Sequence, residues 1–142
     1  MPNFLFRIIL IAAIIFNSAV FLLYGIAKLA GWQFVHHEPP ATLLAKDINP
    51  TAAMWYFFGL KKGYAVLVGI AEIFPALLIL FKRTRLIGSL FFLFTSANVL
   101  AINIFFDITD VTLKISIVLF ANTLIILASE RKKLLALVGK AD

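Results

Sequence analysis

The stretch Leu86–Phe106 reads LIGSLFFLFTSANVLAINIFF and contains no charged residue. A helix rises about 1.5 Å per residue, so this stretch is long enough to cross the roughly 30 Å of hydrocarbon in a bilayer. It therefore predicts a transmembrane helix, and it indicates that lipid is the solvent around much of this chain.

Three further runs have the same character. Ile8–Ala27 is uncharged, Gly63–Phe81 contains only Glu72, and Val111–Ser129 contains only Lys114. The first run is too long for the apolar core of a signal peptide and precedes no small-residue cleavage site, so we expect it to be retained. Together the runs predict an all-α fold, a four-helix transmembrane bundle in a single membrane domain over residues 1–142. Its spans are expected at about residues 5–30, 60–81, 85–106 and 110–129.

The composition of the chain agrees with this assignment. Of 142 residues, 63% are hydrophobic and 14% are charged, whereas roughly a quarter of a soluble domain is charged. The net charge of +6 does not indicate nucleic-acid binding, because the basic residues lie between apolar runs and form no continuous patch. Cysteine is absent, which excludes disulfides, thiolate metal ligands and thiol redox chemistry in this chain.

Lys and Arg in the loops predict an orientation. One side of the predicted bundle carries eight of them and the other side carries five. The eight are Arg7, Lys82, Arg83, Arg85, Arg131, Lys132, Lys133 and Lys140, and the five are Lys28, Lys46, Lys61, Lys62 and Lys114. This bias places both termini in the cytoplasm.

The longest loop, from about Gly31 to Lys62, contains one predicted element. The segment Thr51–Phe58 begins with a cap-like Thr51 and is rich in aromatic residues, which suit the headgroup layer. We expect a short extracytoplasmic interfacial helix here, between the first two spans. In the same loop His36-His37-Glu38 resembles a metal-binding tract, but adjacent histidines point apart and no ligand-spaced partner exists, so no metal site is predicted.

Each predicted span carries a polar residue at a similar depth. Counted from the cytoplasmic charges, Asn17, Glu72, Asn98 and Asn122 all fall roughly 12–20 Å from the inner face, near the middle of the bilayer. With Tyr24 they form a candidate intramembrane polar cluster, which we expect either to bind a ligand or to be satisfied internally.

Glu72 is expected to point into the bundle, because Ala65, Gly69 and Ala76 share its helical face and small residues mark close helix contacts. A carboxylate in hydrocarbon costs at least a few kcal/mol, so it has to be paired, protonated or hydrated. By the same depth count Lys28 lies about 15 Å nearer the outer face. We therefore expect amides and Tyr24, rather than a cation, beside Glu72. The carboxyl would then be either a ligand or proton site, or a hydrogen-bonded contact between helices.

A second polar group is predicted at the outer mouth of the bundle. Lys28, Asp107, Asp110 and Lys114 come to a similar depth, with Asn103 below them. The simplest interpretation is ion pairing that closes the mouth, where exposed pairs add little stability.

Several short segments carry a family resemblance. In order along the chain they are YGIAKL (Tyr24–Leu29), GIAE (Gly69–Glu72), KRTR (Lys82–Arg85), NVLAIN (Asn98–Asn103), and Phe106-Asp107 with the later Lys114. From Arg7 to Ala128 the chain resembles the DoxX family of small bacterial membrane proteins. The resemblance implies a multi-pass four-helix bundle in the bacterial cytoplasmic (inner) membrane. Many DoxX-like proteins have a proline after the aspartate of the third loop, where this chain has Ile108-Thr109.

The family takes its name from a subunit of a quinone-linked thiosulfate-oxidising complex. The resemblance therefore implies, first, a non-catalytic membrane subunit or scaffold of a redox-associated complex. A second hypothesis is a binding protein for a lipophilic molecule such as a quinone, held by Glu72 and the amides. A third is a small transporter or proton-coupled channel.

The sequence also sets expectations about chemistry and partners. No catalytic residue is predicted, because the midplane cluster offers one ionisable group where catalysis needs a nucleophile, a metal or two positioned acid–base groups. No cofactor is intrinsic to the chain, and a quinone is the one candidate. The expected partners are the lipid bilayer and either membrane redox proteins or further copies of the chain, with no nucleic acid.

Overall fold

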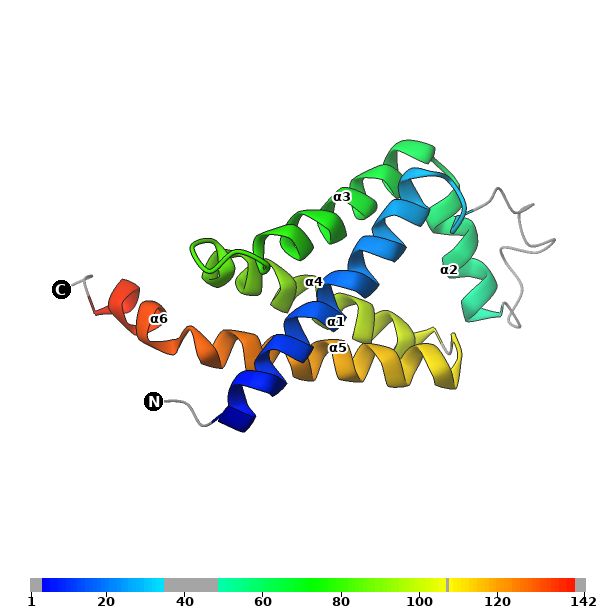
Figure 1. Cartoon of the computed structure of the whole chain (residues 1–142). Coiled ribbons are helices and arrows are strands. Elements are labelled where there is room, and N and C mark those ends of the chain that lie inside the picture. Colours follow the sequence, from blue (N-terminus) through cyan, green and yellow to red (C-terminus); the bar gives the residue numbers. More distant parts are fainter. Residues whose placement is uncertain (1–3, 35–48, 107, 140–142) are drawn as a thin grey trace.

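The computed structural model describes residues 4–34, 49–106 and 108–139. Within these ranges the chain forms helices and no strand, which confirms the all-α prediction (Figure 1). The helices are α1 (Phe4–Leu29), α2 (Pro50–Gly59), α3 (Lys62–Leu78), α4 (Arg85–Phe105), α5 (Asp110–Ser129) and α6 (Arg131–Val138).

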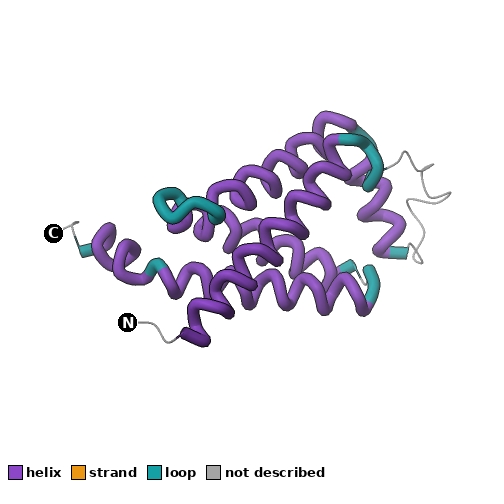
Figure 2. The backbone as a smooth tube through the Cα atoms, in the orientation of Figure 1, coloured by secondary structure: helices purple, strands orange, loops and turns teal. Residues whose placement is uncertain are grey.

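Four of these helices pack in a closed ring. Helix α1 lies against α3 and α5, and α4 lies against the same two helices. Neighbouring helices of the ring run antiparallel, with short loops between α3 and α4 and between α4 and α5 (Figure 2). The start of α1 and helix α6 lie at one end of the molecule, and α2 lies at the other end.

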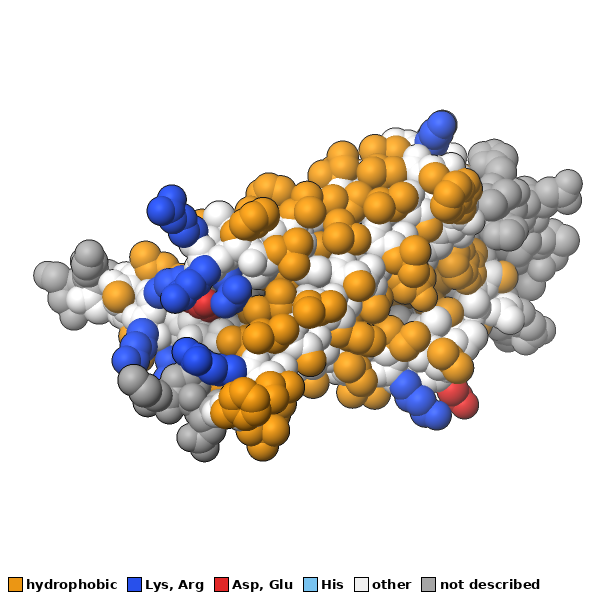
Figure 3. Space-filling view, in the orientation of Figure 1, with side chains coloured by type: hydrophobic (Ala, Val, Ile, Leu, Met, Phe, Trp, Pro, Cys, Tyr) orange, Lys and Arg blue, Asp and Glu red, His pale blue; other side chains and the backbone are white. Residues whose placement is uncertain are grey.

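Three helices are long and apolar enough to cross a membrane, namely α1, α4 and α5. At 17 residues, α3 is shorter than these three. Large apolar side chains project outward from the ring, among them Leu23, Phe94 and Phe105, which are 68%, 74% and 76% exposed. Figure 3 shows such side chains over the middle of the molecule and most of the visible Lys and Arg side chains near the α6 end. This surface suits lipid, and the protein is a membrane protein.

Glycines bring the helices of the ring close together. A Cβ added at Gly25 of α1 would lie 2.9 Å from the carbonyl oxygen of Gly69 in α3, and one added at Gly69 would lie 2.9 Å from that of Gly25. At the C-terminal end of α3, a Cβ added at Gly88 of α4 would lie 2.8 Å from the Leu78 Cβ. Small residues at such crossings let two backbones approach, which is how helices associate in lipid.

The interior combines a compact apolar core with small hydroxyl residues. Phe21 and Phe92 meet edge to face, with ring centroids 4.6 Å apart. The other core residues are Ala13, Ile14, Ala76, Ile79, Leu119 and Ile126. Ser96 and Thr123 are fully buried, and each donates to a carbonyl one turn earlier in its own helix. Such residues add little bulk at a helix contact and leave no hydroxyl unsatisfied.

The short helix predicted within the longest loop exists as α2, but its cap differs from the prediction. Asn49, not Thr51, is the N-cap: its side-chain oxygen accepts from the Ala52 amide at 3.2 Å, and Pro50 occupies the first turn. Proline is common at that position, because it has no amide hydrogen that would be left unpaired. Thr51 instead donates to the Phe106 carbonyl at 2.7 Å and thereby ties α2 to the end of α4.

Helix α6 was not predicted, because its eight residues are too few for a clear pattern and its charges were used only to predict the orientation of the chain. It is linked to the α3–α4 loop by charged contacts. The buried Glu130 lies 2.6 Å from Lys133 Nζ and 3.8 Å from Arg85 Nη1, and Lys133 also donates to the Lys82 carbonyl at 2.9 Å. The loop charges on this side therefore hold one end of the ring together.

Candidate functional site

The central feature of the interior is an ion pair between α1 and α3. Lys28 Nζ lies 2.7 Å from Glu72 Oε2, and each side chain is 5% exposed. The Lys28 ammonium also lies 5.7 Å from the ring centroid of Tyr24 and 5.6 Å from that of Phe34, within the range of cation–π attraction. The predicted inward orientation of Glu72 is confirmed, and Ala65, Gly69 and Ala76 on the same face are also buried.

The expectation that no cation accompanies Glu72 is wrong. It rested on depths counted separately along each helix from the charged loops, whereas the relative height of α1 and α3 is set by where they cross. Gly25 and Gly69 meet at that crossing. Lys28 follows Gly25 by one turn in α1, and Glu72 follows Gly69 by one turn in α3. Because the two helices are antiparallel, the two residues lie on opposite sides of the crossing, each within one turn of it. The long lysine side chain then spans the remaining gap.

This ion pair forms part of the wall of a cavity of about 640 Å³. The cavity lies in the half of the ring nearer to α2, and every helix except α6 contributes to its lining. Most of the lining is apolar. Its polar side chains include Lys28, Glu72, Tyr24, Asn98 and Asn103.

Aromatic rings line the cavity beside α2. The Phe34 ring contacts both Trp55 and Phe58, with centroid distances of 5.3 and 5.1 Å, and Phe58 lies 5.5 Å from Tyr64. From the sequence, the aromatic residues of α2 were expected in the headgroup layer and were not associated with a site. The sequence alone does not show that the turn after α1 folds back to bring Phe34 onto α2.

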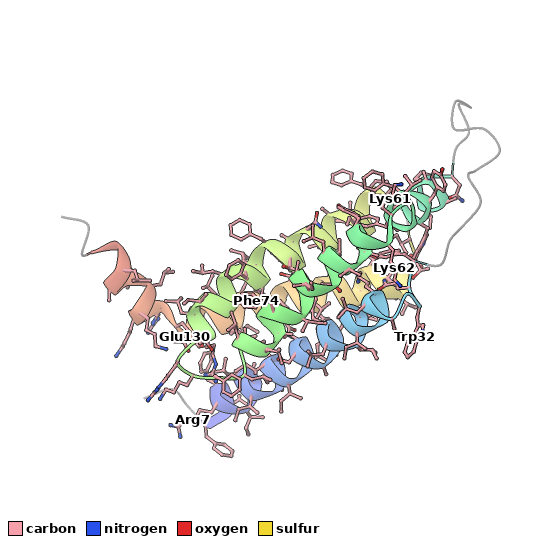
Figure 4. The ribbon with its side chains drawn as sticks, turned by 90° about the horizontal axis from the view of Figure 1, so that it is seen from above. Arg7, Trp32, Lys61, Lys62, Phe74 and Glu130 are labelled. Carbon is pink, nitrogen blue, oxygen red and sulfur yellow. The ribbon has the colours of Figure 1, made fainter. Side chains whose placement is uncertain are left out.

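On the side of α3 and α4 the cavity lining reaches the outer surface. Tyr64, Leu67 and Ala71 of α3, and Phe94 and Asn98 of α4, line the cavity and are also exposed. Farther along, the two helices close again at the edge-to-face contact of Phe74 and Phe91, with centroids 5.6 Å apart. Figure 4 shows Phe74 between the end marked by Lys61, Lys62 and Trp32 and the end marked by Glu130 and Arg7.

The predicted midplane cluster divides into two separate groups. Tyr24, Glu72 and Asn98 line the cavity, whereas Asn17 and Asn122 do not. The fully buried Asn17 donates to the Leu119 carbonyl at 3.0 Å and to Thr123 Oγ1 at 3.1 Å, and it accepts from Asn122 at 3.1 Å. This second group links α1 to α5.

The predicted outer-mouth cluster is only partly assembled. Lys28 turns inward to Glu72, and Asn103 lines the cavity. Asp110 and Lys114 are exposed on α5. Asp110 lies in the first turn of the helix, where the positive end of the helix dipole stabilises its negative charge. Asp107, like the tract His36-His37-Glu38, lies outside the described residues. Within the described ranges no three His, Cys, Asp or Glu side chains gather as a metal site would require.

Fold and cavity together define a small helical membrane protein with a partly polar internal cavity. The chain is 32% identical over 123 residues to the protein YwoB of Bacillus subtilis strain 168, described as an uncharacterized protein, and the match covers 87% of this chain and 77% of YwoB. The chain therefore belongs to the same family as YwoB. No family model matches it. No solved structure matches it significantly either.

Proposed function

We propose that this protein binds a lipophilic small molecule that has a polar head, such as a quinone, within the membrane. The observation that carries the proposal is the 640 Å³ cavity with the Lys28–Glu72 pair in its wall. Ligand pockets typically have volumes of about 300–1,000 Å³ and a mostly apolar lining with a few convergent polar groups. This cavity meets each of these criteria.

The position of the ion pair also supports a binding role. Desolvating a lysine and a carboxylate is costly, and an apolar pair of similar volume would often hold two helices at least as well. Ionisable side chains inside a membrane are accordingly rare and commonly mark functional sites. Lys28 and Glu72 have the donors and acceptors to orient a carbonyl or hydroxyl head, while the aromatic residues beside α2 contact its ring.

The ligand reaches the cavity from the bilayer, between α3 and α4. The exposed lining residues Tyr64, Leu67 and Ala71 lie on one side of this route, and Phe94 and Asn98 lie on the other. A hydrophobic molecule dissolved in lipid could pass between them without crossing water.

In the membrane arrangement that goes with this proposal, α3 also spans the bilayer, giving four spans and both termini in the cytoplasm of a bacterial inner membrane. The ring packing of α3 with α1 and α4 supports its span, and the charge bias in the loops supports the orientation. The resemblance to the DoxX family is part of the same proposal.

The direct test is purification of the full chain in mild detergent, followed by mass spectrometry of the extracted lipids. Ubiquinone and menaquinone analogues are then added, and thermal unfolding is followed. A ligand that binds only the native state raises the melting temperature. We expect a rise for the wild type and none for the double variant Lys28→Met/Glu72→Leu, which loses the polar groups and keeps an apolar wall. If no analogue shifts the wild type and no lipophile co-purifies, the binding proposal is wrong.

A second candidate is a non-catalytic subunit of a membrane redox complex, which the resemblance to DoxX favours. The same purification distinguishes it, because a subunit would carry partner proteins rather than a bound lipophile. Transport is less favoured: each helix of the ring is continuous within the described residues, whereas transporter sites typically form at discontinuous helices.

A further inference from the structure

One side-chain oxygen in the cavity wall accepts no hydrogen bond. Asn103, 8% exposed on α4, donates through Nδ2 to the Val99 carbonyl at 2.8 Å. This contact assigns the orientation of the amide, because a reversed amide would place its oxygen against that carbonyl. Asn103 Oδ1 is then a buried acceptor that receives no hydrogen bond. Leaving a buried acceptor unsatisfied costs roughly 1–3 kcal/mol, so the atom invites a donor from a ligand.

A second acceptor in the same cavity is in the same state. Gln33, in the turn after α1, has a buried side-chain oxygen Oε1 without a partner and also lines the cavity. Among the described residues, these two oxygens are the side-chain polar atoms found buried without a hydrogen bond. Both residues line this one cavity.

The hydrogen bond that the Lys28 ammonium donates goes to Glu72, at 2.7 Å, and neither of the two amide oxygens accepts a hydrogen bond from it. The cavity therefore offers unpaired acceptors toward a ligand, with aromatic rings nearby. A head that has only acceptors, such as an ether or a carbonyl, would leave both amide oxygens unsatisfied.

We infer that the cavity selects a ligand whose head donates a hydrogen bond, namely a hydroxyl on a flat ring attached to an apolar body, with Asn103 Oδ1 as the acceptor. This inference rests on the proposed binding function and adds the chemistry of the head. A reduced quinone and any other lipophilic phenol share this chemistry.

The test uses two probes, 4-nonylphenol and its methyl ether 4-nonylanisole, in which a methyl group replaces the hydrogen of the donating hydroxyl. Binding to the full chain in detergent is measured by titration. We expect the wild type to bind the phenol about three- to tenfold more tightly, the ratio that one hydrogen bond supplies. Asn103→Leu should remove this preference and leave the affinity for the ether unchanged.

Two further variants keep the result interpretable. Asn122→Leu removes an amide that lies outside the cavity, so it should retain the phenol preference. Gln33→Leu removes the second acceptor without changing α4, and it should reduce the preference for the phenol. This variant keeps the inference testable if Asn103→Leu does not fold. Equal binding of the phenol and the ether by the wild type overturns the inference while leaving the binding function standing. Failure of both probes and of every quinone analogue overturns the binding function itself.

Two more probes separate the sources of the hydroxyl. A reduced menaquinone analogue that outcompetes 4-nonylphenol identifies a quinol head. If 1-dodecanol binds as tightly as the phenol, an aliphatic hydroxyl suffices, and the flat-ring part of the inference is overturned.

Discussion

Lys28 and Glu72 are 44 positions apart in the chain, yet Lys28 Nζ donates to Glu72 Oε2 at 2.7 Å inside the protein. The two residues come from adjacent antiparallel helices that cross where Gly25 meets Gly69. Close packing at the crossing thus helps to bring the two side chains together, because a Cβ at either glycine would press against the backbone of the other helix.

The first prediction concerns the energetics of this pair. Lys28→Met or Glu72→Leu alone leaves a buried charge unpaired and should lower the free energy of unfolding by about 3–5 kcal/mol. The double variant should recover most of that loss. Glu72→Gln should be tolerated better than Glu72→Leu, because the amide oxygen can still accept from Lys28. Unfolding in mixed detergent micelles measures all four variants. Additive losses, in which the double variant loses the sum of the two single variants, would show that the side chains do not act as a pair.

The second prediction concerns the crossing itself. In Gly69→Ala the new Cβ would lie 2.9 Å from the Gly25 carbonyl oxygen, which belongs to the backbone and cannot turn away. We expect a loss of about 1–3 kcal/mol of stability as α1 and α3 separate. Gly63→Ala is the matched control in the same helix, because nothing lies within 4 Å of its Cβ. A neutral Gly69→Ala would mean that the crossing is looser than the structure indicates.

Much of the architecture could be predicted from the sequence, because the signals are local. The apolar stretch Leu86–Phe106 corresponds to α4, and the runs Ile8–Ala27 and Val111–Ser129 correspond to α1 and α5. The inward face of Glu72 followed from its spacing to Gly69 and Ala76 within one helix. Burial along one helix depends on periodicity, which a single sequence contains.

The pairing inside the bundle could not be predicted, because it depends on the relative heights of different helices. The cluster of Asn17 with Glu72 failed for this reason: Asn17 bonds to α5, and Glu72 bonds to Lys28. The contact of Phe34 with Trp55 depends in turn on how a loop folds back. The glycines at 25 and 69 were the available signal, since both lie one turn from the residues that pair.

The third prediction separates the structural amides from those of the cavity. Asn17→Leu removes two hydrogen bonds to α5 and leaves Asn122 without its acceptor, so it should cost about 1–2 kcal/mol of stability. Asn98→Leu, on the exposed side of the cavity, should change stability by less than about 0.5 kcal/mol. Thermal unfolding of both variants checks this. The reverse order would exchange the roles assigned to the two amides.

The fourth prediction concerns topology. A reporter that fluoresces only in the cytoplasm, fused after Asp142, should be active, and a periplasmic phosphatase inserted between Pro40 and Ala41 should also be active. A third fusion after Arg83 tests whether α3 crosses the membrane, and it should report the cytoplasm. A periplasmic signal after Asp142 would refute the orientation, and a periplasmic signal after Arg83 would refute a spanning α3.

The last prediction concerns the route between α3 and α4. Trp55 lines the cavity, whereas Trp32 is 74% exposed, and the chain has only these two tryptophans. In a Trp32→Phe background, quenching of Trp55 fluorescence by an added quinone analogue therefore follows its arrival in the cavity. Ala71 is both exposed and part of the lining, so Ala71→Phe places a ring in the proposed opening.

We expect Ala71→Phe to slow quenching several-fold in detergent or vesicles, because association slows when a side chain must first move aside. Ala121→Phe is the matched control, since Ala121 is an exposed residue of α5 outside the cavity. In this control variant, the quinone analogue should quench Trp55 fluorescence at the wild-type rate. If both variants quench at that rate while the analogue still binds, the ligand does not pass between α3 and α4, and the aromatic end beside α2 becomes the route to test. If Ala121→Phe slows quenching equally, a bulkier surface alone explains the effect.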